Sequence, residues 1–402
     1  MLVKKGISIL PILSSCLYMT VVVVFPSAYV NNYYRVRWLL CAIIGAYLIL
    51  HIRTLLTSTY ALLNIAVLLF CFSVYVSSRL NTGYVSSYLK SAITYAFSLL
   101  VLVFYVEYVY LIGKLNKVIS HFYWLTIIWS MITDITAMLG MVSVSDGEGY
   151  LIGNKFSVAY LHLFLIALAY YKFVYCKSDH MRSSIEIRFA ATSCPPVEIH
   201  FIVIYAYCVF GCLYVQCSTA FIGSLLLGVL YIFQKRLITV LRKPCMVMLS
   251  IAVFNSILLV NAAIIQWTPI RYVIETLLGK SSDMTGRLPI YLKIGDLIFR
   301  SPIYGFGMDN NYLVSSATVG AANVQNGIMD LVVSYGIVGA SLFVLFFYLC
   351  VRQNRFTEDP AFLMLVYVFI VFSSIEIPFN LRFCFLLMLL SFSGLVRDQV
   401  ER

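Results

Sequence analysis

Apolar segments of about 20 residues recur along the whole chain, and each is long enough to cross a lipid bilayer as a helix. The chain of 402 residues is 62% hydrophobic and 11% charged, with a mean hydropathy of +0.93. A soluble domain could not hide that much apolar surface. Inside a bilayer the backbone must satisfy its own hydrogen bonds, so these segments predict helices. The sequence therefore predicts an all-α, polytopic integral membrane protein.

We predict about 12 transmembrane helices, at residues 7–29, 38–51, 55–76, 92–112, 120–142, 157–176, 198–215, 219–233, 245–265, 327–350, 360–377 and 380–396. Lys and Arg gather in alternate connections, as they do in cytoplasmic loops. This alternation predicts that both termini are cytoplasmic. The chain then divides into spans 1–9 (residues 1–265), one large extracytoplasmic loop (266–326) and spans 10–12 (327–402).

The net charge of +11 does not indicate nucleic-acid binding, because no Lys/Arg-rich domain is present to follow a phosphate backbone. We interpret it as charge that orients the protein and contacts membrane lipids. The eleven cysteines lie mostly within apolar runs and include no C-x-x-C pair, which favours buried packing over disulfides. No D-x-D motif or His/carboxylate cluster indicates a metal, and no cofactor is expected.

The outer loop contains two predicted helices. Thr268-Pro269 is typical of a helix start and predicts a short helix over 269–278. In residues 287–300 apolar side chains recur at helical spacing, with charged ones on the opposite side. This pattern predicts an amphipathic helix lying along the membrane surface, which Pro302 would end.

Four motifs follow one another between residues 283 and 339. They are Asp283-Met-Thr-Gly-Arg287, Ser301-Pro-Ile-Tyr-Gly305-Phe-Gly307, Gln325-Asn326-Gly and Gly336-Ile-Val-Gly339. In this order and spacing they resemble the O-antigen polymerase and O-antigen ligase superfamily. The resemblance implies a glycosyltransferase-C-like architecture and an undecaprenyl-pyrophosphate-linked oligosaccharide as substrate. It also implies a location in the bacterial inner membrane, with a chain-length regulator protein as a further partner.

Two departures from the family pattern bear on the reaction. Gln325 stands where the family's ligases carry His, and glutamine cannot act as a general base at neutral pH. The stretch 217–220 also lacks the Arg of a Ser-Arg pair that many members show. The resemblance therefore favours a polysaccharide polymerase of O-antigen or capsule. An O-antigen ligase, and a lipid-linked oligosaccharide flippase or transporter, remain open as alternatives.

When a glycan is transferred from a lipid pyrophosphate, the leaving group develops negative charge, which a positively charged side chain can stabilise. Some acceptors also need a general base. Arg287 and Arg300 are the predicted catalytic cations, because a guanidinium pairs with two phosphate oxygens, and Asp309 is the predicted base. Predicted substrate-binding residues are Arg271, Asp283, Gly305, Gly307, Gln325, Asn326, Arg79 and Arg35. The alternatives are contact of these arginines with lipid headgroups, and capping of a turn by Asp309.

Four further ionisable residues fall within or near predicted spans, and Asp330 lies one turn inside the helix expected after Asn326. Such residues are functional hypotheses by default because burying them is costly. Glu107 and Glu376 lie near span ends, where they can reach the interface. Asp134 and His162 lie deeper on neighbouring spans, which fits either a structural hydrogen bond or a proton relay.

Overall fold

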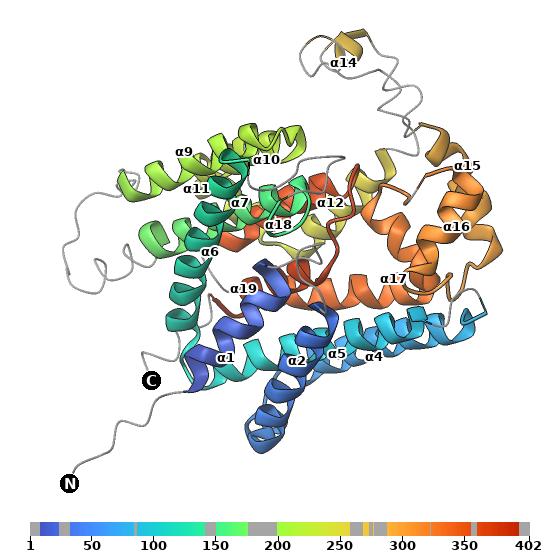
Figure 1. Cartoon of the computed structure of the whole chain (residues 1–402), viewed down its shortest axis with the longest axis horizontal. Coiled ribbons are helices and arrows are strands. Elements are labelled where there is room, and N and C mark those ends of the chain that lie inside the picture. Colours follow the sequence, from blue (N-terminus) through green and yellow to red (C-terminus); the bar gives the residue numbers. More distant parts are fainter. Residues whose placement is uncertain are drawn as a thin grey trace.

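The protein is all-helical in the parts of the chain that the structure describes, and no strand occurs there. This computed structural model describes residues 9–23, 33–83, 87–140, 150–175, 199–257, 268–272, 276, 288–321, 323–354 and 360–393. The predicted all-α class is confirmed for these residues (Figure 1).

The helices follow the apolar pattern of the sequence closely. The first half contains α1 (Ile9–Tyr18) continued by the π-helix η1 (Met19–Val23), α2 (Tyr33–Leu50), α3 (Ile52–Leu56), α4 (Ala61–Leu80), α5 (Ser87–Leu111), α6 (Leu115–Met138) and α7 (Lys155–Tyr170) continued by the π-helix η3 (Tyr171–Tyr175). The second half contains α9 (Ile199–Tyr214), α10 (Ser218–Ile232), α11 (Gln234–Leu241), α12 (Pro244–Ile257), α14 (Thr268–Tyr272), α15 (Leu288–Arg300), α16 (Asn310–Val319), α17 (Gly327–Asn354), α18 (Ala361–Phe372) and α19 (Leu381–Ser393).

Five of the described helices are long and apolar enough to cross a membrane: Ala61–Leu80, Tyr88–Leu111, Leu115–Met138, Lys155–Val174 and Gly327–Asn354. Helices α10 and α11 reach that length only together, and they are bent by 97°. Five other predicted spans contain shorter apolar helices, and the predicted span 38–51 coincides with most of α2, which has 18 residues. The structure is therefore compatible with a membrane protein, while the number of 12 spans stays a prediction.

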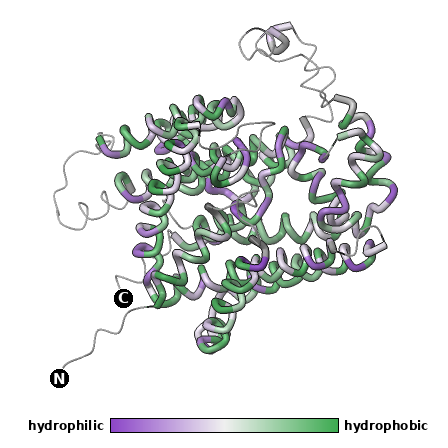
Figure 2. The backbone as a smooth tube through the Cα atoms, viewed as in Figure 1, coloured by the Kyte–Doolittle hydropathy of each residue, from purple (hydrophilic) through white to green (hydrophobic). Residues whose placement is uncertain are grey.

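Hydrophobic residues follow one another along most of the helices, as Figure 2 shows, and many of them are exposed. Ile49 on α2, Phe72 on α4 and Ile202 on α9 are each more than half exposed. Exposed apolar surface of this kind marks contact with lipid or with another protein. It agrees with helices whose outer faces meet acyl chains.

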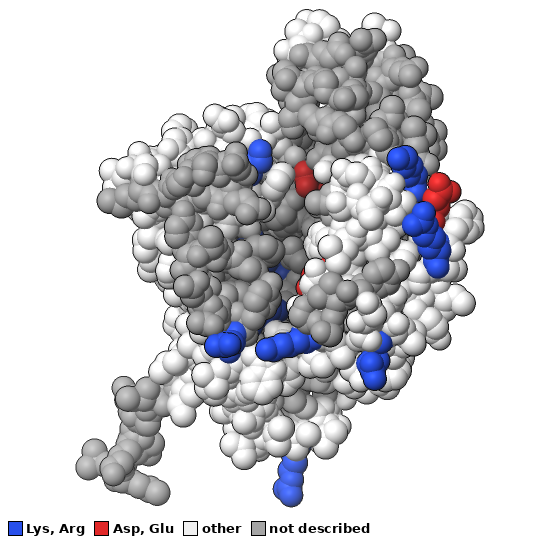
Figure 3. Space-filling view, turned by 45° about the vertical axis from the view of Figure 1, so that its right-hand side comes forward, with Lys and Arg blue, Asp and Glu red and all other residues white. Residues whose placement is uncertain are grey.

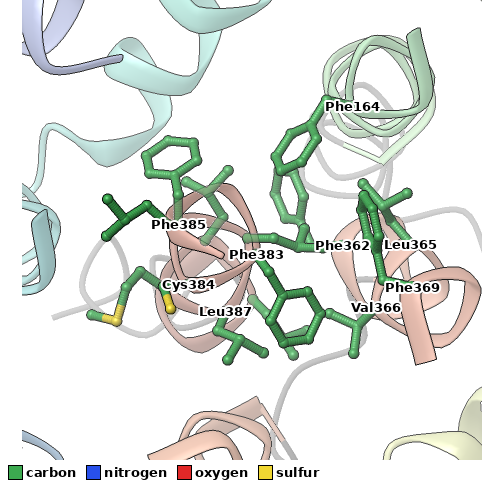
Figure 4. Packing of buried hydrophobic residues seen from close by; sticks show 14 of the residues in the cluster. Phe164, Phe362, Leu365, Val366, Phe369, Phe383, Cys384, Phe385 and Leu387 are labelled. Carbon is green, nitrogen blue, oxygen red and sulfur yellow. The ribbon is translucent and has the colours of Figure 1, made fainter. Parts of the chain in front are cut away.

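Helices α18 and α19 form the centre of the molecule although they have only 12 and 13 residues. Almost all their side chains are buried, and Figure 4 shows Phe369 of α18, Phe383 of α19 and Phe164 of α7 packed together. The ring centroids of Phe369 and Phe383 are 6.0 Å apart. The connection between the two helices, residues 373–380, is buried or half-buried as well.

Helix α17 is the long element against which α4, α12 and α19 pack. Its first residue and its N-cap coincide with the helix predicted to begin near Asn326. The contact between α17 and α4 brings the C-terminal end of α4 beside the middle of α17. The functional site described below is built around that contact.

Helix α15 confirms the predicted helix over 287–300, but not its place along a membrane surface. Its charged residues Lys293 and Asp296 are exposed, as expected. Its apolar side, with Ile290, Ile294 and Leu297, is buried against residues of α16 and α17. The apolar stripe therefore packs on protein, because α16 offers it a partner that the sequence did not reveal.

The remaining elements of this loop differ from the prediction in extent. Helix α14 begins at the predicted start, Thr268, and is described to Tyr272. The rest of the predicted helix over 269–278, apart from residue 276, lies outside the described residues. Helix α16 was not predicted, because its Ser- and Thr-containing sequence has low intrinsic helix propensity and resembles a loop.

Candidate functional site

Helix α17 is broken at Gly336, about one third of the way along its length. The backbone there has φ 67° and ψ −175°, a conformation open almost only to glycine. The break leaves carbonyl groups before it, and N–H groups after it, without partners within the helix. Such groups must be satisfied elsewhere if they are buried.

The turn at residues 301–307 fills this break. Four backbone hydrogen bonds join the two segments: Phe306 N–H to Val333 O (2.8 Å), Gly307 N–H to Ser334 O (2.8 Å), Ile337 N–H to Pro302 O (2.8 Å) and Val338 N–H to Ile303 O (3.3 Å). The turn thus supplies the partners that the break in α17 removes. Two motifs that the sequence presents separately are one structural unit.

Both glycines of the turn are needed for this close approach. Gly305 has φ 65°, and a Cβ atom on it would lie 2.5 Å from the backbone nitrogen of Gly336. Gly307 has φ 86°, and its Cβ would lie 2.8 Å from Cα of Ser78. Their predicted role was substrate binding, and the structure gives them a role in backbone packing.

The C-terminal end of α4 contacts both the turn and the broken part of α17. The Ser77 hydroxyl donates a hydrogen bond to Ser334 O of α17 (2.8 Å), and the Asn81 amide donates one to Gly305 O of the turn (3.0 Å). The Ser78 hydroxyl accepts a hydrogen bond from Met308 N–H (3.0 Å). These contacts fix the backbone immediately before Asp309.

Asp309 occupies the N-cap position of α16 with a left-handed backbone (φ 63°), but its side chain makes no capping hydrogen bond. The carboxyl group instead lines a cavity. Burial raises the pKa of Asp309, and a hydrogen bond with Ser91 offsets part of that rise. The alternative interpretation of Asp309 as a turn cap therefore lacks the hydrogen bond that it requires.

The start of α17 is fixed by Asn326, which is buried. Its side-chain oxygen accepts a hydrogen bond from Met329 N–H (3.0 Å), which makes it the N-cap of the helix. Gly327 N–H donates to Ser373 O (2.7 Å), so the helix start is attached to the end of α18. The adjacent Gln325 has a left-handed backbone (φ 49°) and lines the same cavity as Asp309.

The cavity lies where α5, α7, α16, α17 and residues 376–382 meet, and its volume is about 380 Å³. Sites for small molecules commonly measure about 300–1,000 Å³. Its polar lining consists of three acids, one base, five amides, four tyrosines and two serines: Asp309, Asp330, Glu376; Arg382; Asn154, Asn311, Asn323, Gln325, Asn380; Tyr95, Tyr160, Tyr312, Tyr335; Ser157, Ser334. Figure 3 shows a hollow in the molecular surface in which acidic and basic atoms are visible.

The charged groups of the cavity are held in place by neighbouring polar groups. The Asn311 amide donates a hydrogen bond to Asp330 (3.0 Å), and Arg382, which is 5% exposed, donates one to Ser157 O (3.3 Å). Carboxylates can accept hydrogen bonds from the hydroxyl groups of a sugar, amides can both accept and donate them, and tyrosine rings can pack on its apolar face. A guanidinium suits phosphate oxygens. The lining therefore combines groups for both parts of a glycan phosphate.

Three of the predicted arginines have described side chains, and none of the three lines this cavity. Arg300 is exposed at the end of α15 and donates a hydrogen bond to Thr318 (3.3 Å). Arg79, at the end of α4, and Arg35, near the start of α2, are also exposed. The side chain of Arg271, on α14, and the residues Asp283 and Arg287 lie outside the described part of the chain.

Arg382 is the cavity residue that the sequence analysis missed most clearly. It lies within the predicted span 380–396, where an ionisable side chain is a functional hypothesis by default. The charge of Arg382 could have been noticed in the sequence, but it stands alone in an apolar run, and the run was interpreted as a span. Tyr95, Asn154 and Asn380 carried no comparable signal, because tyrosines and amides near span ends are common.

The other ionisable residues within spans have defined surroundings. Glu107 is buried and accepts a hydrogen bond from Ser58, whereas Glu376 lines the cavity. His162 Nε2 lies 3.0 Å from Asp134, and Tyr207 donates a further hydrogen bond to the same carboxylate oxygen. The predicted contact between Asp134 and His162 is thus confirmed.

Both ring nitrogens of His162 have a partner inside the protein. His162 Nδ1 lies 2.9 Å from the carbonyl oxygen of Val158, which can only accept a hydrogen bond, and Nε2 lies 3.0 Å from Asp134. These contacts fix the orientation of the imidazole ring.

No known family model matches the chain, and no curated protein is similar to it in sequence. Among the described residues no three His, Cys, Asp or Glu side chains are grouped so that they could hold a metal ion. The site must therefore be interpreted from its own geometry.

Proposed function

We propose that the protein is a polysaccharide polymerase of the bacterial inner membrane, acting on O-antigen or capsule repeat units. It transfers a glycan from undecaprenyl pyrophosphate to a sugar hydroxyl at the outer face of that membrane. The observation that carries this proposal is the cavity in which Asp309, Asp330 and Glu376 meet Arg382 among amides and tyrosines. The motif resemblance supplies the identity of the carrier.

The cavity lining suggests how the reaction is divided among residues. The acceptor hydroxyl attacks the anomeric carbon, the bond from that carbon to phosphate oxygen breaks, and the lipid pyrophosphate leaves. The proton of the hydroxyl passes to Asp309, whose raised pKa brings it closer to the range of an effective general base. Arg382 is the cation of the cavity lining, so we assign it to the phosphate oxygens. Arg287 remains a candidate for the same task.

The orientation of the protein supports this proposal only if the cavity opens to the outer side. The positive-inside pattern predicts cytoplasmic termini and an outer loop over 266–326. A cysteine in place of Asp283 should react with a membrane-impermeant thiol reagent added to intact spheroplasts. Labelling only after the inner face is opened would contradict the proposed orientation.

The test of activity is the polysaccharide made by a strain that carries only a variant protein. Asp309→Asn and Arg382→Gln should remove the ladder of long chains while leaving the protein level in the membrane unchanged. Lys293→Gln, on the exposed face of α15, is the matched control and should leave a full ladder. A full ladder from both cavity variants would refute the assignment of the cavity. Arg287→Ala and Arg300→Gln test the cations predicted from sequence in the same assay.

A lipid-linked oligosaccharide flippase is the second candidate, and the break in α17 favours it. Transporters commonly place discontinuous helices around the substrate, as α17 is placed at this cavity. A strain without the gene distinguishes the two functions. One repeat unit displayed on the cell surface supports a polymerase, and no repeat unit on the surface supports a flippase.

A further inference from the structure

A second, apolar groove of about 460 Å³ lies toward the opposite end of α7 from the cavity. Tyr160 lines the cavity and Tyr170 lines the groove, which places them about 15 Å apart along the helix. The other walls of the groove come from α9 and α10, which Figure 1 shows at the end of the molecule away from α15 and α16. A ligand in the groove is therefore separate from one in the cavity.

The floor of the groove is preformed by packed aromatic rings. Tyr170 stacks on Tyr231 with ring centroids 4.0 Å apart, and Tyr205 donates a hydrogen bond to Ser224 O (2.9 Å). Gly228 leaves the space for this tyrosine, because a Cβ atom there would lie 2.3 Å from its hydroxyl oxygen. The shape of the groove is thus set by contacts within the protein.

The outer wall of the groove is apolar and open to the surroundings of the protein. Leu225, Val229 and Ile232 of α10 line the groove and are 45%, 48% and 73% exposed. A small polar ligand would find few hydrogen-bonding groups there. A flexible hydrocarbon chain would bury both its own surface and these side chains.

One end of the groove is basic. The chain bends by 97° between α10 and α11, and Lys235, just after the bend, lines the groove. Arg236, on α11, and Lys243, two residues after the end of α11, are both exposed. The described charged side chains at this end of the groove are thus basic, and they suit a negatively charged group.

We infer that the groove binds an anionic glycerophospholipid. One acyl chain lies in the groove against Tyr170 and Leu225, and the phosphate-containing headgroup meets Lys235, Arg236 and Lys243. Helix α11 is amphipathic and lies at a right angle to α10, as a helix on a membrane surface does. The combination of an apolar groove with a basic end selects this class of lipid over neutral ones.

Native mass spectrometry of the full chain in detergent tests this inference. The probes are phosphatidylglycerol and phosphatidylcholine with the same acyl chains. The wild-type protein should retain one phosphatidylglycerol at least tenfold more strongly than phosphatidylcholine. Leu225→Trp, which fills the groove, should weaken phosphatidylglycerol binding by a similar factor, whereas Ile222→Trp, exposed on the same helix but outside the groove, should not.

The headgroup is tested by a triple variant, Lys235→Ala with Arg236→Ala and Lys243→Ala. All three side chains are exposed, so the variant should fold even if Leu225→Trp does not. It should bind the two lipids equally weakly, while Lys114→Ala with Lys117→Ala should behave as wild type. Equal retention of both lipids by the wild-type protein, or unchanged selectivity in the triple variant, would overturn the inference.

Discussion

Replacing Gly336 by alanine tests whether the turn at 301–307 and the break in α17 form one unit. A Cβ atom at this position would lie 2.0 Å from the carbonyl oxygen of Ile303, and 2.5 Å from the nitrogen of Tyr304. Both are backbone atoms, so no side-chain rotation can relieve the overlap. The turn must therefore withdraw from α17, or α17 must change its conformation.

The expected cost has two parts. A non-glycine residue in this backbone conformation is strained by about 1–3 kcal/mol. Withdrawal of the turn also breaks hydrogen bonds to Val333, Ser334 and Ile337, and each buried group left without a partner costs about 1–3 kcal/mol. If only two such groups lose their partners, the total loss of stability is about 3–9 kcal/mol. A loss of this size exceeds the effect of most single substitutions.

Two other glycines separate these contributions, with thermal unfolding of the purified protein in detergent as the assay. Gly295 lies in α15 with no atom within 4 Å of its added Cβ, so alanine there should be neutral or slightly stabilising. Gly320 ends α16 with φ 77° and also has open space around it, so alanine there should cost only the backbone strain. Gly336→Ala should be clearly less stable than Gly320→Ala. Equal unfolding temperatures for these two variants would refute the proposed unit.

Two further predictions concern buried charge. Burial raises the pKa of Asp309, so the folded chain is destabilised above that pKa, when the carboxylate must be ionised. Asp309→Asn should therefore raise the unfolding temperature at pH 7, and the difference from wild type should disappear as the pH falls to about 4; the exposed Asp296→Asn is the control, and a pH-independent difference would argue against burial as the cause. Asp134→Ala should cost about 1–3 kcal/mol because it leaves His162 without its partner, and adding His162→Leu should recover part of that loss. Tyr207→Phe should cost about 1–3 kcal/mol in the same unfolding assay, and unchanged unfolding temperatures of both Asp134→Ala and Tyr207→Phe would contradict a stabilising role of these contacts.

Much of the fold could be predicted from the apolar runs and the amphipathic spacing of the sequence. Apolar runs predicted helices at α4 to α7 and at α17 within a few residues, because length and hydropathy directly reflect burial in an apolar environment. The amphipathic spacing also predicted α15. Helix α16 was missed because its stability comes from packing against α15 and α17, and such packing overrides weak local propensity.

The site was predictable only in part, because the sequence shows which residues are unusual but not which of them meet. Asp309, Gln325 and Asp330 were singled out, and all three line the cavity. Arg300 was chosen because a guanidinium pairs with phosphate oxygens, yet it is exposed at the end of its helix. Arg382 is more than 50 residues further along the chain and reaches the cavity only because α18 and α19 end inside the protein.

The two interruptions of helical structure at the cavity have a common consequence. The break at Gly336 and the connection at 373–380 both place irregular backbone beside the cavity. The turn at 301–307 supplies hydrogen-bond partners at the break, and the start of α17 supplies them to the carbonyl groups of Ser373 and Ser374. The shape of the cavity is therefore set by backbone contacts, whereas its chemistry is set by side chains such as Asp309 and Arg382. Substitutions of these side chains should change what the cavity binds without changing its shape. Substitutions of Gly305 or Gly336 should remove the cavity itself.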